Sequence, residues 1–190
     1  MNHPKTWTGR VLIGVSLDGF IARSDGDIDW LTNPPRHPHQ LVESSRHAQS
    51  WATFFPAIDH LVMGRGTYEK VASFPEWPYA DKQVIVLSTT LPDDDERVVV
   101  VRTLERACSA LVQGGARQVY VDGGQVIGLF LRNGLIDELT TSHAPVLIGS
   151  GLPLFGALEH DIRLTLLASH ATQDGMVHAT YRVERPTPAL

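Results

Sequence analysis

The segment Val119-Tyr120-Val121-Asp122-Gly123-Gly124-Gln125 is the most informative part of the chain, because a strand-like apolar run ends there in a glycine pair. Two earlier apolar runs end in a comparable way, in the segments Val62-Met63-Gly64-Arg65-Gly66-Thr67-Tyr68-Glu69 and Val86-Leu87-Ser88-Thr89-Thr90. In chain order, helix-like sequence follows the first and the third of these breaks. A break at the carboxyl end of a strand leaves backbone N–H groups available, and a helix that starts there adds the positive end of its dipole. The three breaks therefore predict a site for a phosphate-bearing ligand, with a nucleotide cofactor as the leading hypothesis.

The alternation of apolar runs with helical spacing predicts one α/β domain over residues 1–190, with frayed tails at 1–9 and 186–190. Asp174-Gly175 favours a tight hairpin between the last two strands. The pattern therefore predicts a mostly parallel mixed sheet that closes with a C-terminal antiparallel hairpin. We expect strands over residues 10–22, 59–63, 83–87, 97–101, 118–121, 138–144, 163–172 and 176–185, helices over 40–55, 65–73, 104–112 and 125–132, and loops from the first strand to about residue 39 and over 145–156.

The composition argues against several classes of function. The net charge is −5 and the three lysines form no basic run, so nothing favours a nucleic-acid partner. Cys108 is the single cysteine, which excludes an internal disulfide framework and suits a reducing compartment. The N-terminus shows no secretory pattern, so we expect a cytoplasmic protein without a membrane partner. The nine histidines form no H-E-x-x-H motif, so no metal is expected.

Four segments, taken in order, resemble the dihydrofolate reductase-like superfamily, and more narrowly the RibD C-terminal domain, which is the reductase part of the bifunctional riboflavin-biosynthesis deaminase/reductase. The resemblance implies a three-layer α/β fold and an NADPH-dependent oxidoreductase that transfers a hydride to a pyrimidine or pteridine-type small molecule. It also implies a homodimer. The segments that carry the resemblance are Ile13 to Ala22, Met63 to Glu69, Val121 to Gly124 and Ala144 to Phe155.

The resemblance assigns the cofactor contacts mainly to the three breaks. Arg65 would be the charge partner of a cofactor phosphate, since a guanidinium can bind phosphate through two hydrogen bonds. The glycine pair would let the backbone approach the pyrophosphate. The expected cofactor contacts are Ile21, Ala22, Gly64, Arg65, Thr67, Ser88, Thr89, Gly123, Gly124, Gln125 and Val126. The alternatives are a solvated surface arginine and ordinary strand-to-turn transitions.

The segment 18–30 resembles the mobile loop that closes over nicotinamide in the dihydrofolate reductases. Asp29 is the candidate carboxylate that orients a substrate or relays a proton, and Trp30 lies at the far end of the loop. The alternative makes Asp29 a turn residue and Trp30 a core aromatic. Residues 31–36 hold no Asp or Glu, whereas classical dihydrofolate reductases use a carboxylate there to bind the pterin. Dihydrofolate is therefore a less favoured substrate than a riboflavin-pathway pyrimidine.

Other functions stay open at this stage. Gln125 stands where the dinucleotide fingerprint G-x-G-x-x-G needs its second glycine, which disfavours a doubly wound dehydrogenase. A nucleotide-binding module without turnover would keep the same breaks, and so would a carbonyl or xenobiotic reductase on the same scaffold. Fold and cofactor binding alone do not separate these functions.

Overall fold

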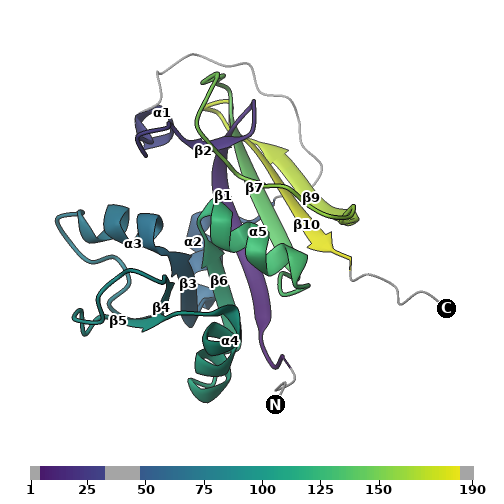
Figure 1. Ribbon diagram of the computed structural model, residues 1–190. Helices are drawn as coiled ribbons and strands as arrows, with labels where there is room; N and C mark the ends of the chain where they lie inside the picture. The colour runs from purple at the N-terminus through teal and green to yellow at the C-terminus, as the bar shows by residue number, and fades with distance from the viewer. Residues whose placement is uncertain (1–4, 33–47, 185–190) are drawn as a thin grey trace.

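An eight-stranded sheet forms the centre of the computed structural model, which describes residues 5–32 and 48–184 (Figure 1). Its strands are β1 (Thr8–Ser16), β3 (His60–Gly64), β4 (Gln83–Leu87), β5 (Val98–Val101), β6 (Gln118–Asp122), β7 (Glu138–Ala144), β9 (Leu164–Ala171) and β10 (Val177–Val183). They lie in the order β5-β4-β3-β6-β1-β7-β10-β9. The first six of these run parallel, whereas β10 pairs antiparallel with both β7 and β9. The predicted mixed sheet with its closing antiparallel hairpin is confirmed.

Helices cover both faces of the sheet and complete three layers. Helices α4 (Leu104–Gln113) and α5 (Gly124–Arg132) bury Leu111 and Ile127 against Val121 of β6. On the opposite face, α2 (Trp51–Phe54) and α3 (Arg65–Ala72) contribute to a second core that contains Val71 and Tyr120. Neighbouring residues of a strand point to opposite faces, so Tyr120 and Val121 belong to different cores. Each fully buried aliphatic side chain stabilises the fold by about 1.5–3 kcal/mol relative to exposure.

The single strand that we expected over residues 10–22 is wrong, because a tight turn divides it into β1 and β2 (Phe20–Ala22). Gly19 adopts a φ of +92°, and the Ser16 hydroxyl accepts a hydrogen bond from the Phe20 N–H at 3.0 Å. The Asp18 carboxylate accepts hydrogen bonds from the backbone N–H groups of Ile148 and Gly149. These contacts hold the 145–156 segment beside β2, and there β8 (Leu152–Pro153) pairs with β2, although the sequence predicted only a loop.

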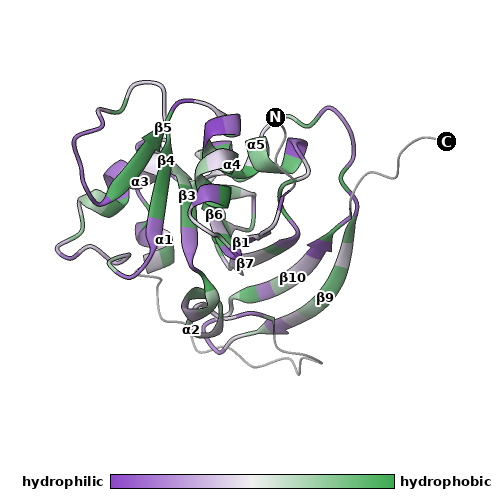
Figure 2. Ribbon diagram, turned by 90° about the horizontal axis from the view of Figure 1, so that it is seen from below, coloured by the Kyte–Doolittle hydropathy of each residue, from purple (hydrophilic) through white to green (hydrophobic). Residues whose placement is uncertain are grey.

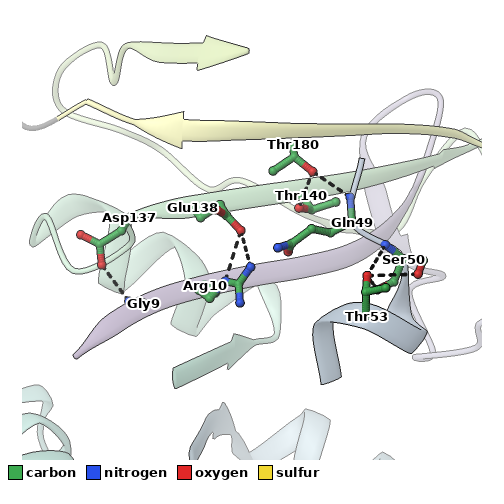
Figure 3. Close-up of polar contacts among 9 residues, drawn as sticks. All are labelled: Gly9, Arg10, Gln49, Ser50, Thr53, Asp137, Glu138, Thr140 and Thr180. Carbon is green, nitrogen blue, oxygen red and sulfur yellow. Dashed lines mark hydrogen bonds and ion pairs between the residues drawn. The ribbon is translucent and has the colours of Figure 1, made fainter. Parts of the chain in front are cut away.

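Of the helix predicted over residues 40–55, the described part is confirmed for residues 51–54 and is wrong for residues 48–50. Residues 40–47 lie outside the described residues, and α2 begins only at Trp51 and is followed by the 3₁₀ turn η1 (Phe55–Ala57). Ser50 is extended and forms a capping box with Thr53. The N–H of Gln49 donates to the Thr180 hydroxyl of β10 at 3.3 Å (Figure 3). The N–H of Ala48 donates to Nδ1 of a β9 histidine, so tertiary hydrogen bonds take the place of helical ones at residues 48 and 49.

Two smaller differences concern the ends of the predicted loops and tails. The loop predicted after the first strand contains a short helix, α1 (Asp29–Thr32). Its continuation to residue 39 lies outside the described residues. Of the tail expected at 1–9, Trp7 is buried and Thr8 already begins β1.

Candidate nucleotide and substrate site

A cavity of about 1000 Å³ opens at the carboxyl ends of the central parallel strands. Its described lining comes from β1, β2, α1, residue 49, α2, α3, β6, β7, β8 and β10, and from the loops that join them. The volume lies at the upper end of the range of about 300–1000 Å³ that small-molecule and cofactor sites occupy. Ligands of open α/β sheets bind at this end of the strands, so we take the cavity as the candidate site.

The first and the third sequence breaks meet at the cavity wall. Gly123 has a φ of +86°, and a Cβ at this position would lie 2.4 Å from Oγ1 of Thr67. A residue with a side chain therefore cannot replace Gly123 without strain and a clash. No side-chain hydrogen bond caps the first residues of α3 or α5. The first backbone N–H groups of a helix have no partner within the helix, so these two starts form a cradle suited to a phosphate.

The second break lies beside the first, joined by a side-chain hydrogen bond. Arg65 donates from its Nε to Glu69 at 2.6 Å and from an Nη to the Thr90 hydroxyl at 2.9 Å. The Ser88 hydroxyl accepts from the backbone N–H groups of Thr90 and Leu91, so it already stabilises the turn. A second guanidinium, from Arg102, donates to the carbonyl oxygens of Ser88 and Leu91. Two cations thus flank this break, next to the cradle but outside the cavity lining.

The structure brings some of the predicted cofactor residues into the cavity and leaves others around it. Ile21, Ala22, Thr67 and Gly123 line the cavity. Gly124 instead permits a close contact, since a Cβ there would lie 2.6 Å from the carbonyl oxygen of Pro153. The predicted residues outside the described lining are Gly64, Arg65, Ser88, Thr89, Gly124, the exposed Gln125 and the buried Val126.

Neither predicted catalytic residue lines the cavity. Asp29 accepts a hydrogen bond from the N–H of Trp30 at 2.7 Å, and its exposed carboxylate lies 3.4 Å from the Arg23 guanidinium. Trp30 is 5% exposed and packs inside the protein. Their neighbours Ile28 and Leu31 line the cavity instead. In this geometry Asp29 stabilises the start of α1, which corresponds to the turn interpretation of this residue.

Asp122 is a cavity residue that the sequence reasoning did not select. Desolvation raises its pKa to about 6, although the Gly123 N–H at 2.8 Å and Tyr120 act in the opposite direction. Burial also raises the pKa of Tyr79, and the Asp122 charge adds to that shift. All three of Asp122, Tyr79 and Tyr120 line the cavity. The sequence did contain a signal for this residue, because Asp122 stands directly between a strand-like apolar run and the glycine pair. Carboxyl groups with shifted pKa values often take part in catalysis.

Two other findings concern all the described residues. Within residues 5–32 and 48–184, no group of three or more metal-ligating side chains is placed to hold an ion. In the same described ranges, each helix is too short or too polar to span a bilayer.

The sheet order and the three layers define a protein with a dihydrofolate reductase-like fold, and comparison with known proteins narrows the class. The sequence profile of the RibD C-terminal domain matches residues 10–178. The chain therefore belongs to the RibD C-terminal domain family, a family of oxidoreductases.

Three known proteins illustrate the similarity. The uncharacterised protein YwjB of Bacillus subtilis is 35% identical over 159 residues, which cover 81% of this chain and 86% of YwjB. A crystal structure from Shewanella sp. PV-4, provisionally assigned to riboflavin biosynthesis, superposes with a TM-score of 0.78 at 34% identity and covers 94% of this chain and 99% of that one. Dihydrofolate reductase from Enterococcus faecalis, solved with NADP(H), shares the fold at a TM-score of 0.65 and 17% identity, with 94% and 97% of the two chains covered.

Proposed function

We propose that the protein is a cytoplasmic NADPH-dependent reductase of the riboflavin-pathway pyrimidine reductase type. One observation carries the proposal: a single cavity joins a phosphate cradle at Thr67 and Gly123, an apolar wall that includes Ile21 and Ala22, and the proton-binding carboxyl of Asp122. Family membership supports the reaction class. The substrate we propose is a pyrimidine or pteridine-type ring compound.

The residues of the cradle fit a nicotinamide dinucleotide phosphate. The bare backbone at Gly123 and the uncapped starts of α3 and α5 suit the pyrophosphate. Arg65 and Arg102 beside the second break suit an additional phosphate on the adenosine ribose. Bound NADPH would supply a hydride. Ile21 and Ala22 would orient the nicotinamide and exclude water from it.

Asp122 is the residue that we propose as the proton source. A carboxyl with a pKa of about 6 is partly protonated near neutral pH, which suits a general acid. Hydride addition to a C=N or C=C bond leaves charge on the neighbouring atom, and the Asp122 proton would neutralise it. Replacement of Asp122 by Asn is expected to lower the turnover number by about 10²- to 10⁴-fold, the usual contribution of general acid–base catalysis. Asp25→Asn, at another cavity-lining acid, is the matched control.

Turnover is the test of this function. Purified protein is incubated with NADPH and a panel of ribosylamino-pyrimidinones, pterins and ketones, with NADPH oxidation followed by absorbance and the reduced product by mass spectrometry. We expect oxidation with a pyrimidinone or pterin. NADPH binding without oxidation of any candidate would favour the binding-module alternative, and turnover of ketones alone would favour a carbonyl reductase.

We further propose that two copies of the chain pair through β9. This strand is the edge of the sheet, and Leu164, Leu166 and Leu167 are 42%, 55% and 38% exposed on it. Figure 2 shows β9 as the outermost strand of the antiparallel end, with apolar residues along its length. An exposed edge that carries leucines readily pairs with another strand, and closed dimers are the commonest assembly of soluble proteins.

A further inference from the structure

One row of sheet partners crosses the cavity side of β1, β7, β10 and β9. Gly14 pairs with Ser142, Ser142 with His178, and His178 with His170. The first three of these residues line the cavity. Gly14 has no side chain, and Leu31 packs over it so closely that a Cβ at residue 14 would lie 2.4 Å from the leucine. The cavity floor is therefore apolar at Gly14, where Leu31 covers the backbone of β1, and polar at Ser142 of β7 and His178 of β10.

The polar part of this floor lies far from the phosphate cradle. Gly123 follows β6, and the sheet order places β1 and β7 between β6 and β10. Strand neighbours are spaced about 4.8 Å apart, so His178 lies roughly 14 Å across the sheet from the cradle. A cofactor held at Gly123 therefore leaves the β7–β10 end of the cavity for the second reactant.

The hydrogen-bond pattern fixes the protons of the two stacked histidines. The rings of His170 and His178 stack with centroids 4.8 Å apart. The N–H of Ala48 donates to Nδ1 of His170, so this nitrogen carries no proton and His170 is neutral. His178 therefore does not stack on a cation. Burial lowers the pKa of His178, so its ring is also neutral near pH 7.

Ser142 selects the tautomer of His178. The Ser142 hydroxyl lies 2.7 Å from Nδ1 of His178 and is 4% exposed. Among the described residues it has no second hydrogen-bond partner. If Nδ1 carried the proton and donated to the hydroxyl, the buried hydroxyl proton would lack an acceptor, which is costly. The favoured arrangement has Ser142 donating to Nδ1, so the His178 proton resides on Nε2. Within the described chain, no protein group forms a hydrogen bond with Nε2 of His178.

We propose that Nε2–H of His178 is a substrate-specificity donor that binds a carbonyl oxygen or an unprotonated ring nitrogen of an uncharged planar heterocycle. This inference rests on the proposed function, because it places one edge of the reducible ring at the β7–β10 end of the same cavity and leaves the other edge toward Asp122. The donor selects rings of the uracil and lumazine kind, since both present carbonyl oxygens at their edges. Ser142 acts as the positioning residue that holds the proton on Nε2.

The test measures equilibrium binding of lumazine and uracil to NADPH-saturated protein. His178→Phe keeps a ring to stack on His170 and removes the donor, so lumazine should bind about three- to tenfold more weakly, as expected for one neutral hydrogen bond. His178→Gln places an amide N–H near the lost donor and should restore most of the affinity. His170→Phe, which changes the stack outside the cavity lining, is the matched control and should leave lumazine binding unchanged.

Two further measurements make the outcome decisive. Nitrogen chemical shifts of the free protein should show the Nε2–H tautomer of His178 in the wild type and a mixture of tautomers in Ser142→Ala. NADPH affinity, titrated separately, should be equal in all variants. If the wild type does not bind NADPH, the proposed function is refuted, whatever the result at His178. Equal lumazine affinity for the wild type and His178→Phe would overturn the proposal. So would an equal loss in His170→Phe, an Nδ1–H tautomer, or no binding of either ring to NADPH-loaded wild type.

Discussion

Asp122 shows how the surroundings of one residue govern both stability and chemistry. Its side chain is shielded at the end of a central strand, so the folded protein holds the proton more tightly than the unfolded chain does, with a pKa of about 6 against 3.8. A raised carboxyl pKa contributes stability at low pH, and this contribution is lost as the pH rises through the interval from about 4 to 6. The fold therefore tolerates a destabilising charge at neutral pH, in the place where a reductase needs a proton.

Asp122→Asn is expected to stabilise the protein at pH 8 by about 1–3 kcal/mol, because the shift of the Asp122 pKa corresponds to at most about 3 kcal/mol and cavity water reduces it. Urea denaturation at pH 8 and at pH 4 measures the effect. The gain should disappear at pH 4, where the wild-type carboxyl is protonated. A variant equally stable to the wild type at both pH values would contradict the burial of this charge.

Gly123 sets the shape of the cradle at the level of a single backbone angle. Gly123→Ala should destabilise the protein and weaken NADPH binding by at least about tenfold, because a Cβ there meets the Thr67 hydroxyl and the φ is +86°. Gly115→Ala is the matched control, since its φ is +71° and no atom lies within 4 Å of its Cβ position. Thermal melts and an NADPH titration compare the two. Equal NADPH affinity in both variants would argue against a cradle at Gly123.

At the scale of the element, α3 carries the charge that should distinguish NADPH from NADH. Arg65→Ala is expected to weaken NADPH binding by about tenfold or more and NADH binding little, because only NADPH has the extra phosphate that a guanidinium can bind. Glu69→Gln, which removes the partner of Arg65 on the same helix, should strengthen NADPH binding. Parallel losses for the two nucleotides in Arg65→Ala would remove Arg65 from the phosphate site.

Most elements could be predicted from local sequence. An apolar run indicates a strand, helical spacing indicates a helix and a glycine marks its end, and each of these signals involves only residues close together in the chain. The hairpin at Gly175 and the helix after Gly123 are of this kind. The division of β1 from β2 could not be predicted, since Asp18 binds backbone 130 residues away. The late start of α2 depends likewise on β9 and β10. In the site, the glycine break was predictable, whereas the Asp122 pKa depends on how the folded chain buries its carboxyl.

The whole molecule presents two sheet edges, and they allow a controlled test of assembly. Leu166→Asp on β9 should convert a dimer into a monomer, because a charge would be buried without a partner at the proposed contact. Val99→Asp on β5 is the control, since Val99 and Leu166 are each 55% exposed at opposite edges. Light scattering after gel filtration gives the mass. A monomeric wild type, or dissociation by Val99→Asp instead, would refute pairing through β9.

The proposed function requires that the cavity at the carboxyl end of the sheet binds NADPH. The most direct measurement is a titration of the purified protein with NADPH and with NADH, followed by energy transfer from tryptophan to nicotinamide, since Trp51 lines the cavity. We expect saturable binding that is at least about tenfold tighter for NADPH, the discrimination expected from one charge-assisted phosphate contact. If neither nucleotide binds, the glycine breaks are ordinary turns and the cavity is not a cofactor site.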